Sequence, residues 1–375
     1  MKKLLEKTRK YLMPLIIALW FSFLLLPFKG IKASAFLFIV LSLAIPAMQL
    51  LSNFIKKIHL PQIDFNRYIP QDKRYLPLLL IPLAAVPFLA EDYIIDVAIM
   101  SGIYIILALG LNVVIGFTGL LNLGFVAFYA IGAYSYALIN TNLGLGFWSA
   151  MPISVLLTTI SGFLLAIPAM RLKGDYLAIV TLGFGEIVRL IFNNWDSFTK
   201  GPNGISGIDP PFLFILPIDS LPDFYYLVLL LVIISVFIMT RVKASKIGRA
   251  WIAIREDEIA SSAVGINKTL HKLYSFAFGA FWAGLAGCLF AAKMRFVSPE
   301  SFTFMESVLV LCMVILGGLG SIRGVIFGAI ILVFLPEALR EVQMYRMLAL
   351  GAGLVLLMIF RPQGLFRGES VSTRS

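Results

Sequence analysis

The chain has few of the residues that build enzyme active sites. Among its 375 residues there are only two cysteines and two histidines. Cys288 and Cys312 both lie inside apolar runs, so we expect small core residues rather than a disulfide framework or a metal site. The sequence contains no G-x-x-x-x-G-K-[ST] phosphate-binding loop and no H-E-x-x-H zinc motif. Any energy that the protein uses must therefore come from a partner or from an ion gradient.

Charged residues are also scarce. They make up 14% of the chain against 60% hydrophobic residues, and the mean hydropathy is +0.93. A soluble globule of this length could not cover so much apolar surface with polar groups. The apolar residues form blocks close to the ~20 residues of a membrane-spanning helix, whereas barrel strands would be about 10 residues of alternating character. The sequence predicts an all-α polytopic membrane protein.

The apolar segments predict about ten to twelve transmembrane helices. Placing both termini in the cytoplasm puts 23 of the 31 Lys and Arg residues on the cytoplasmic side, as the positive-inside rule expects. The net charge of +11 is then a consequence of topology and not the basic face of a nucleic-acid binder. The apolar segments are 11–28, 33–51, 76–90, 94–115, 120–139, 149–170, 176–193, 223–240, 273–291, 304–319, 324–339 and 346–360.

Three parts of the chain are expected. Residues 1–90 form an N-terminal extension with two or three spans and a basic connector at 52–75. Lysines and arginines precede the first apolar run, and Ala33-Ser34-Ala35 resembles a signal-peptidase site, but the run is long enough to span and is expected to stay uncleaved. Residues 91–367 form the main membrane domain with a cytoplasmic loop at 241–272, and residues 368–375 form a short tail.

The stretch 173–207 is the best candidate for a substrate path. Gly183, Gly185 and the Glu186/Arg189 pair interrupt an otherwise apolar segment. Broken helices at membrane depth are tolerated where the backbone faces a cavity. An amphipathic surface helix followed by a turn at residues 201–204 explains the pattern equally well. The path residues proposed from sequence are Asn112, Asn122, Gly183, Gly185, Glu186 and Asn193.

Glycines recur at helical spacing in the C-terminal half of the chain. Small residues four apart let helix backbones approach closely in lipid, so packing is the favoured interpretation over a direct substrate role. The predicted packing residues are Gly279, Gly287, Gly317, Gly318, Gly320, Gly324 and Gly328.

The loop 241–272 combines an apolar stripe with flanking charges. Gly248 and Gly265 are predicted to bracket one short helix parallel to the membrane. Such a helix suits docking into a groove of another protein, and it equally suits lying on the lipid surface.

Three runs resemble the permeases of ABC importers for branched-chain amino acids, and the second run resembles the M-type member of the permease pair. They lie at 112–134 (NVVIGFTGLLNLGFVAFYAIGAY), at 174–207 (GDYLAIVTLGFGEIVRLIFNN with GPNGISG) and at 248–329 (GRAWIAIREDEIASSAVGIN with GGLGSIRGVIFGA). The resemblance implies a bacterial inner-membrane heterodimer with a homologous permease, two ATPase subunits that carry ATP and Mg, and a periplasmic binding protein. No cofactor is expected on this chain.

The resemblance also assigns 248–265 as the segment that couples to the ATPases. The match to the importer pattern Glu-Ala-Ala followed by Gly is loose, because Ile259 stands six residues before Gly265 and Glu258 lies one further back. The implied coupling residues are Gly248, Arg249, Ala250, Ile254, Arg255, Glu258, Ala263 and Gly265.

The predicted function is an ATP-driven importer permease for branched-chain amino acids, without its own catalysis. Three alternatives remain open from sequence: an ion-driven secondary transporter, the urea or short-amide branch of the same family, and a membrane enzyme acting on lipid-linked substrates. The last would need an acid/base or metal constellation, and the run Glu256-Asp257-Glu258 is the only cluster available.

Overall fold

The computed structural model describes most of the central part of the chain. It covers residues 83–88, 90–172, 174–213, 216–218, 220–338 and 364–366, with single residues at 19, 38, 42 and 351. The chain divides into two compact units, Met1–Asp64 and Phe65–Ser375. The predicted spans 11–28, 33–51 and 346–360, the connector 52–75 and the tail 368–375 lie outside the described residues, apart from those single positions.

Helices make up nearly all of the described secondary structure. The strands are pairs of residues that join loops: β1 pairs antiparallel with β4, and β2 pairs antiparallel with β3. The elements are α3 (Asp92–Asn112), η3 (Val113–Phe117), α4 (Val126–Leu143), α5 (Phe147–Ala169), α6 (Asp175–Asn194), α7 (Asp196–Thr199), η4 (Gly201–Asn203), β1 (Ile205–Ser206), β2 (Phe212–Leu213), β3 (Leu216–Pro217), α8 (Leu221–Ala244), α9 (Lys246–Glu256), α10 (Glu258–Ala263), α11 (Lys268–Met294), β4 (Phe296–Val297), η5 (Pro299–Phe302), α12 (Phe304–Gly317) and α13 (Ile322–Ala338).

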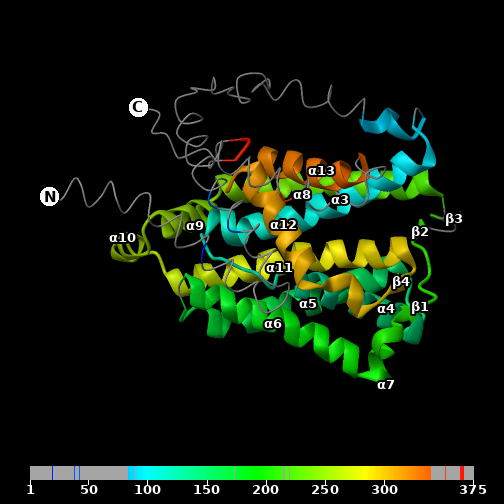
Figure 1. Cartoon of the computed structure of the whole chain (residues 1–375), viewed down its shortest axis with the longest axis horizontal. Coiled ribbons are helices and arrows are strands. Elements are labelled where there is room, and N and C mark those ends of the chain that lie inside the picture. The colour runs from blue at the N-terminus through cyan, green and yellow to red at the C-terminus, as the bar shows by residue number, and fades with distance from the viewer. Residues whose placement is uncertain are drawn as a thin grey trace. The chain divides into compact units, whose positions relative to one another are not determined.

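Helix α11 lies at the centre of this bundle and packs against α3, α4 and α5 (Figure 1). Small residues allow these close contacts. A Cβ at Gly279 would lie 3.1 Å from the Gly110 carbonyl oxygen of α3, and a Cβ at Gly287 would overlap the Tyr129 carbonyl of α4. With no side chain between them the helix backbones meet directly, so dispersion contacts hold the bundle together where lipid gives no hydrophobic gain.

The remaining glycines of the C-terminal half lie where α12 meets α13. A Cβ at Gly317 or at Gly324 would overlap the other's carbonyl oxygen, and Gly328 lies against the Met313 carbonyl. Gly318 and Gly320 differ from these, because both lie in the turn between the two helices with positive φ angles of 109° and 78°. They shape a loop that an L side chain would strain.

Four described helices are long and apolar enough to cross a membrane: α3 with η3, α5, α8 and α11. They correspond to the predicted segments 94–115, 149–170, 223–240 and 273–291. The prediction of a helix over 120–139 is wrong at its start, because α4 begins only at Val126. Gly119 adopts a positive φ of 73°, and the Asn122 side chain accepts a hydrogen bond from the Gly124 amide, so residues 119–124 take a non-helical path.

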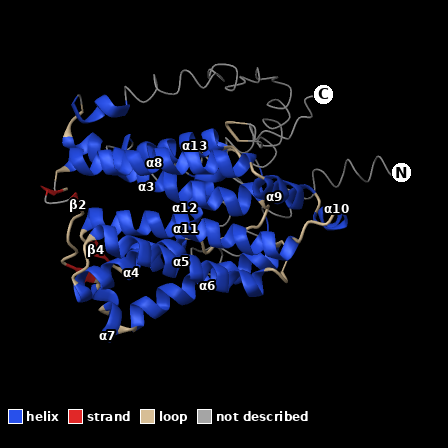
Figure 2. Ribbon diagram, turned by 180° about the vertical axis from the view of Figure 1, so that it is seen from behind, coloured by secondary structure: helices blue, strands red, loops and turns tan. Residues whose placement is uncertain are grey.

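The loops gather at two opposite ends of the bundle (Figure 2). At one end, Lys243 donates to the Gly320 carbonyl and Arg255 donates to the Gly116 carbonyl. At the other end, β1 pairs with β4, and the Asp209 amide donates to the Asn140 side chain. The loops 116–119, 241–272 and 320–323, which the charge distribution predicts to share one side, therefore do lie together.

Helix α6 runs unbroken through Gly183 and Gly185. The broken helix that was one interpretation of 173–207 is therefore wrong. Among the described residues with a positive φ neither Gly183 nor Gly185 appears, so both keep the backbone conformation of the helix. The predicted turn at 201–204 is confirmed as η4, followed by Gly204 with a φ of 67°.

Candidate functional site

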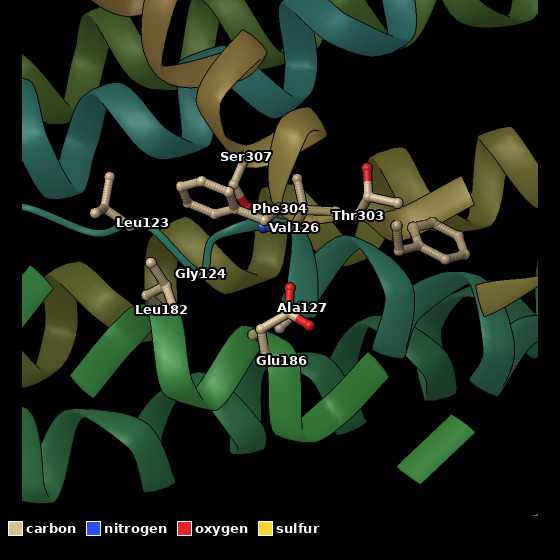
Figure 3. Close-up of a pocket in the computed structure, with 11 residues that line it drawn as sticks. Leu123, Gly124, Val126, Ala127, Leu182, Glu186, Thr303, Phe304 and Ser307 are labelled. Carbon is tan, nitrogen blue, oxygen red and sulfur yellow. Dashed lines mark hydrogen bonds between the residues drawn. The ribbon is translucent and has the colours of Figure 1, made fainter. Parts of the chain in front are cut away.

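A small cleft lies between the segment before α4, helix α6 and the start of α12 (Figure 3). It holds about 220 Å³ of empty space, including the part open to the outside. This figure counts open space in front of the cleft, so the enclosed part is far smaller than the about 300–1,000 Å³ of a pocket for a drug-sized ligand, and a solute could pass only if the walls moved apart. Its lining residues are Leu123, Gly124, Val126, Ala127, Leu182, Gly185, Glu186, Phe302, Thr303, Phe304 and Ser307.

One wall of the cleft is a contact between two backbones. A Cβ on Gly185 would lie 3.1 Å from the Gly124 Cα, and a Cβ on Gly124 would overlap the Thr181 carbonyl. The Leu123 amide donates to the Thr181 hydroxyl at 3.1 Å, which fastens the extended segment to α6. Two glycines in register thus bring the segment against the helix with no side chain between them.

The opposite wall carries the polar side chains of α12 and of the residue before it. Ser307 accepts a hydrogen bond from the Val126 amide at 3.2 Å, so it holds the first turn of α4. Thr303 precedes α12 directly, and Phe304 begins it. Ser307 is a polar residue inside the apolar segment 304–319, and it is not among the path residues predicted from sequence.

Glu186 supplies the charge that borders the cleft, and Figure 3 shows its side chain directed from α6 toward α4. The Arg189 guanidinium donates to one Glu186 oxygen through Nε at 3.0 Å and Nη2 at 2.9 Å. The predicted i, i+3 pair is therefore formed, with side-chain exposures of 34% and 27%. A carboxylate held in this way could accept the ammonium group of an amino acid.

The other path residues proposed from sequence do not line the cleft themselves. Asn112 is buried and accepts a hydrogen bond from the Gly320 amide at 2.9 Å, so it clamps a loop. Asn193 is near the end of α6, and its carbonyl approaches Gly201. Asn122 lies beside the lining and holds Gly124, while its buried Nδ2 has no hydrogen-bond partner in the described part of the chain. Of the six, only Gly185 and Glu186 line the cleft.

Two further carboxylates within the helix bundle have partners on neighbouring helices. Asp96 of α3 pairs with Lys293 of α11, and Glu306 of α12 accepts a hydrogen bond from the Tyr104 hydroxyl at 2.8 Å. These contacts join helices to one another and occupy the groups that an ion-coupled carrier would use to bind its ion.

The coupling segment folds as two helices and not as the single bracketed helix that was predicted. Gly248 lies inside α9, against the carbonyls of Val242 and Lys243, and therefore does not end a helix. Asp257 starts α10, because its carboxylate accepts hydrogen bonds from the Ala260 and Ile259 amides at 2.9 and 2.8 Å. These amide donors lower the pKa of the Asp257 carboxyl below its ordinary value.

One face of this pair of helices packs on the membrane bundle. Gly248, Ala250 and Ile254 are buried, together with Trp251, whose indole donates to the His271 carbonyl at 2.8 Å. The other face is open. Ile259 and Val264 are 79% and 77% exposed, and Arg249, Ala263 and Gly265 are exposed beside them.

Two charged residues of the segment turn inward. Glu258 lies 3.0 Å from the ammonium group of Lys272 and 3.4 Å from that of Lys268, both in the first turns of α11. Lys272 is only 5% exposed, so the pair is nearly desolvated on that side. Arg255 donates to the Gly116 carbonyl at the end of η3. Both contacts tie the segment to the membrane helices.

Comparison with known proteins identifies the family. The model described as branched-chain amino acid transport system / permease component matches residues 93–360. The chain belongs to this permease family. It is 48% identical over 332 residues to the high-affinity permease protein LivM of Salmonella typhimurium, covering 82% of this chain and 78% of that protein.

More distant relatives cover most of the chain as well. The probable permease LivM of Methanocaldococcus jannaschii is 24% identical, over 75% of this chain and 95% of its own. The permease LivH of Escherichia coli is 25% identical, over 71% and 92%. No solved structure matches the chain. As a member of this family with long apolar helices, the protein is a multi-pass membrane protein.

Proposed function

We propose that this chain is the permease subunit of an ATP-driven importer that moves branched-chain amino acids into the cytoplasm across the inner membrane. The observation that carries the proposal is the 48% identity to LivM, which extends over most of both proteins. The chain has no phosphate-binding loop, so ATP and Mg would be bound by partner ATPases and not here.

The exposed face of α9 and α10 would bind the ATPase subunits. Ile259 and Val264 are large apolar side chains that are exposed on this face, which suits insertion into an apolar groove of a cytoplasmic partner. The buried face would carry the motion inward through Ile254 and Trp251. This proposal requires 241–272 to be cytoplasmic, as its seven Lys and Arg residues favour.

A second, homologous permease would cover helix α6. The Glu186–Arg189 pair is partly exposed on this helix, beside the large apolar side chains of Ile187 and Leu190. Charged groups within membrane helices face protein or water rather than lipid, because lipid offers no hydrogen bonds. A protein partner over this face would also close the open side of the cleft and place the solute path at the interface.

The substrate would be a zwitterion with an apolar side chain, delivered by a periplasmic binding protein. Glu186 could accept the ammonium group, while Phe304 and Leu182 would contact the hydrocarbon part. The cleft is smaller than such a ligand needs, so it would represent a closed state that opens during transport.

Reconstitution tests the proposal. We expect the chain to co-purify with a second permease and two ATPase subunits, and proteoliposomes of that complex to accumulate labelled leucine only when ATP and the binding protein are supplied. Vanadate should stop uptake and ionophores should not. Accumulation by the purified chain alone, stopped by ionophores and indifferent to vanadate, would show a secondary transporter instead.

A further inference from the structure

Arg255 of the coupling helix caps the end of a buried membrane helix. Helix α3 ends in the π-helical turn η3, after which the Gly119 and Leu120 amides bond back to the Ile115 and Val114 carbonyls at 3.1 and 3.0 Å. The last carbonyls of a helix need donors from elsewhere. Gly116 receives its donor from the Arg255 guanidinium, 139 residues away in sequence.

The Arg255 side chain packs against two glycines, Gly119 and Gly320. A Cβ at Gly119 would lie 2.8 Å from the Arg255 Cγ, and a Cβ at Gly320 would lie 3.0 Å from its Nη1. Both glycines have positive φ angles, 73° and 78°. Any other residue at either position would be strained and would press on the arginine side chain.

Hydrogen bonds around Arg255 and Gly320 join four segments at the cytoplasmic-side end of the bundle. The Gly320 amide donates to Asn112 at the end of α3, and the Gly320 carbonyl accepts from Lys243 at the end of α8, at 2.9 and 3.1 Å. Arg255 adds α9 to this network and is held from its other side by Glu256, at 2.8 Å. Asn112, which the sequence suggested as a path residue, thus belongs to this hydrogen-bond network.

The backbone that follows this hydrogen-bond network lines the cleft. Residues 118–125 form the single non-helical segment that connects η3 to α4. Two residues of this segment, Leu123 and Gly124, line the cleft. The Thr118 hydroxyl donates to the Val113 and Val114 carbonyls at 2.9 Å, so the start of this segment moves with the π-helical turn. A shift of Arg255 would therefore act through its hydrogen bond to Gly116, from which a short stretch of backbone leads to one cleft wall.

We propose that Arg255 is a positioning residue that transmits movement of the coupling segment to the cleft wall 118–124 through the π-helical end of α3. Its partner is this chain's own backbone and not an ATPase subunit. The inference rests on the proposed function, because it concerns how that importer would couple ATP hydrolysis to the path. A planar guanidinium suits this role, since it can bond Gly116 and Glu256 at once, which a lysine cannot do in the same geometry.

The test uses the complete reconstituted transporter with Arg255→Gln and, as a matched control, Arg241→Gln. Arg241 lies in the last turn of α8, close in sequence to Lys243, but its guanidinium stacks over Phe237 of the same helix. We expect Arg255→Gln to retain the ATPase subunits and their ATP hydrolysis while leucine uptake falls about tenfold, as follows from losing one hydrogen bond to a charged group. Amide hydrogen exchange of residues 118–124 should rise only in this variant.

Three results would overturn the inference. One is normal uptake with unchanged exchange in Arg255→Gln. Another is loss of the ATPase subunits with unchanged exchange at 118–124, which would make Arg255 a docking residue. The third is increased exchange at 118–124 in Arg241→Gln to the same degree.

Failure of the proposed function gives a different pattern, because the unsubstituted complex would then not transport. The exchange comparison would still judge the positioning role, since it does not depend on transport. If the Gln variant does not reach the membrane, Arg255→Lys takes its place. Lysine keeps the positive charge but lacks the paired donors of the planar guanidinium. This variant should show the same rise in exchange with a smaller loss of uptake.

Discussion

Glu258, the first residue of α10, shows how a charge at the edge of the bundle can stabilise a buried group. Its carboxylate neutralises Lys272, whose side chain is almost fully buried at the start of α11, while the more exposed Lys268 lies at the margin of the pair. A buried ammonium without a counter-charge is far more costly than one that is paired. The ion pair therefore holds the beginning of α10 against the central helix of the bundle.

Removing this carboxylate should destabilise the protein. We expect Glu258→Gln to lower the free energy of unfolding by about 3 kcal/mol, the cost of leaving a buried charge unpaired. Lys268→Gln should cost under ~1 kcal/mol, because that lysine is 45% exposed and such pairs contribute little. Thermal denaturation of the purified chain in detergent measures both.

The double variant Glu258→Gln/Lys272→Met separates the two explanations for such a loss. It should recover most of the stability, since no buried charge remains. A double variant as unstable as Glu258→Gln would mean that the carboxylate acts through some other contact.

At the residue scale the sequence singles out charged side chains but does not show what they contact. Arg255 and Glu258 were singled out as charges in a segment that resembles a coupling loop. Arg255 contacts Gly116, 139 positions away, and Glu258 contacts Lys272, 14 positions away. The contact of Arg255 also depends on two glycines with positive φ that no local sequence pattern predicts. The Glu186–Arg189 pair could be predicted because both partners lie on one turn of a helix.

Among the helices, glycines differ sharply in what surrounds them. Gly287 of α11 meets the backbone of α4, where an added Cβ would overlap the Tyr129 carbonyl. Gly183 of α6 has no other part of the described chain within 4 Å of that position. Both glycines lie inside helices and would look alike to a propensity argument, so they form a natural pair for comparison.

Alanine at these two positions should have opposite effects. Gly287→Ala should lower the free energy of unfolding by about 1–3 kcal/mol, because α4 and α11 must separate to accommodate the methyl group. Gly183→Ala should raise it by up to ~1 kcal/mol through better helix propensity. Melting temperatures of the purified variants give the comparison. Equal effects at both sites would contradict the packing role of Gly287.

Helix positions were largely predictable because long apolar runs leave little choice, as α3, α5, α8 and α11 show. The errors fall where a backbone detail overrides the apolar pattern. The segment 119–124 is apolar enough for a helix, yet Gly119 and the Asn122 side chain divert it. Conversely, Gly183 and Gly185 suggested a break in α6 that tertiary packing does not require.

For the molecule as a whole, charge distribution predicted which loops lie together, and the described loops at 116–119, 241–272 and 320–323 meet as expected. The cleft could not be predicted in the same way. Its walls come from residues about 123–127, 182–186 and 302–307, and nothing in the sequence indicates that these three stretches meet.

Cross-linking can locate the surface that the second permease would cover. A photoreactive cross-linker attached through a maleimide to a cysteine placed at Ile187 on α6 should capture that partner in the assembled transporter. Cysteine at Leu164 on α5, which is similarly exposed and apolar but has no charged pair beside it, should not. Immunoblots of the non-reduced complex read the result. Cross-linking from Leu164 alone would place the partner on the α5 face instead.

The backbone contact between Gly124 and Gly185 also limits how the transporter could change its solute range. A wall built from main chain offers almost no side chain to exchange without pushing the segment off α6. Variation would have to come from the side chains around this contact, Leu182 and Glu186 on α6 and Thr303, Phe304 and Ser307 on the facing side. Descendants of this protein that accept different solutes should therefore differ at these side chains and keep both glycines.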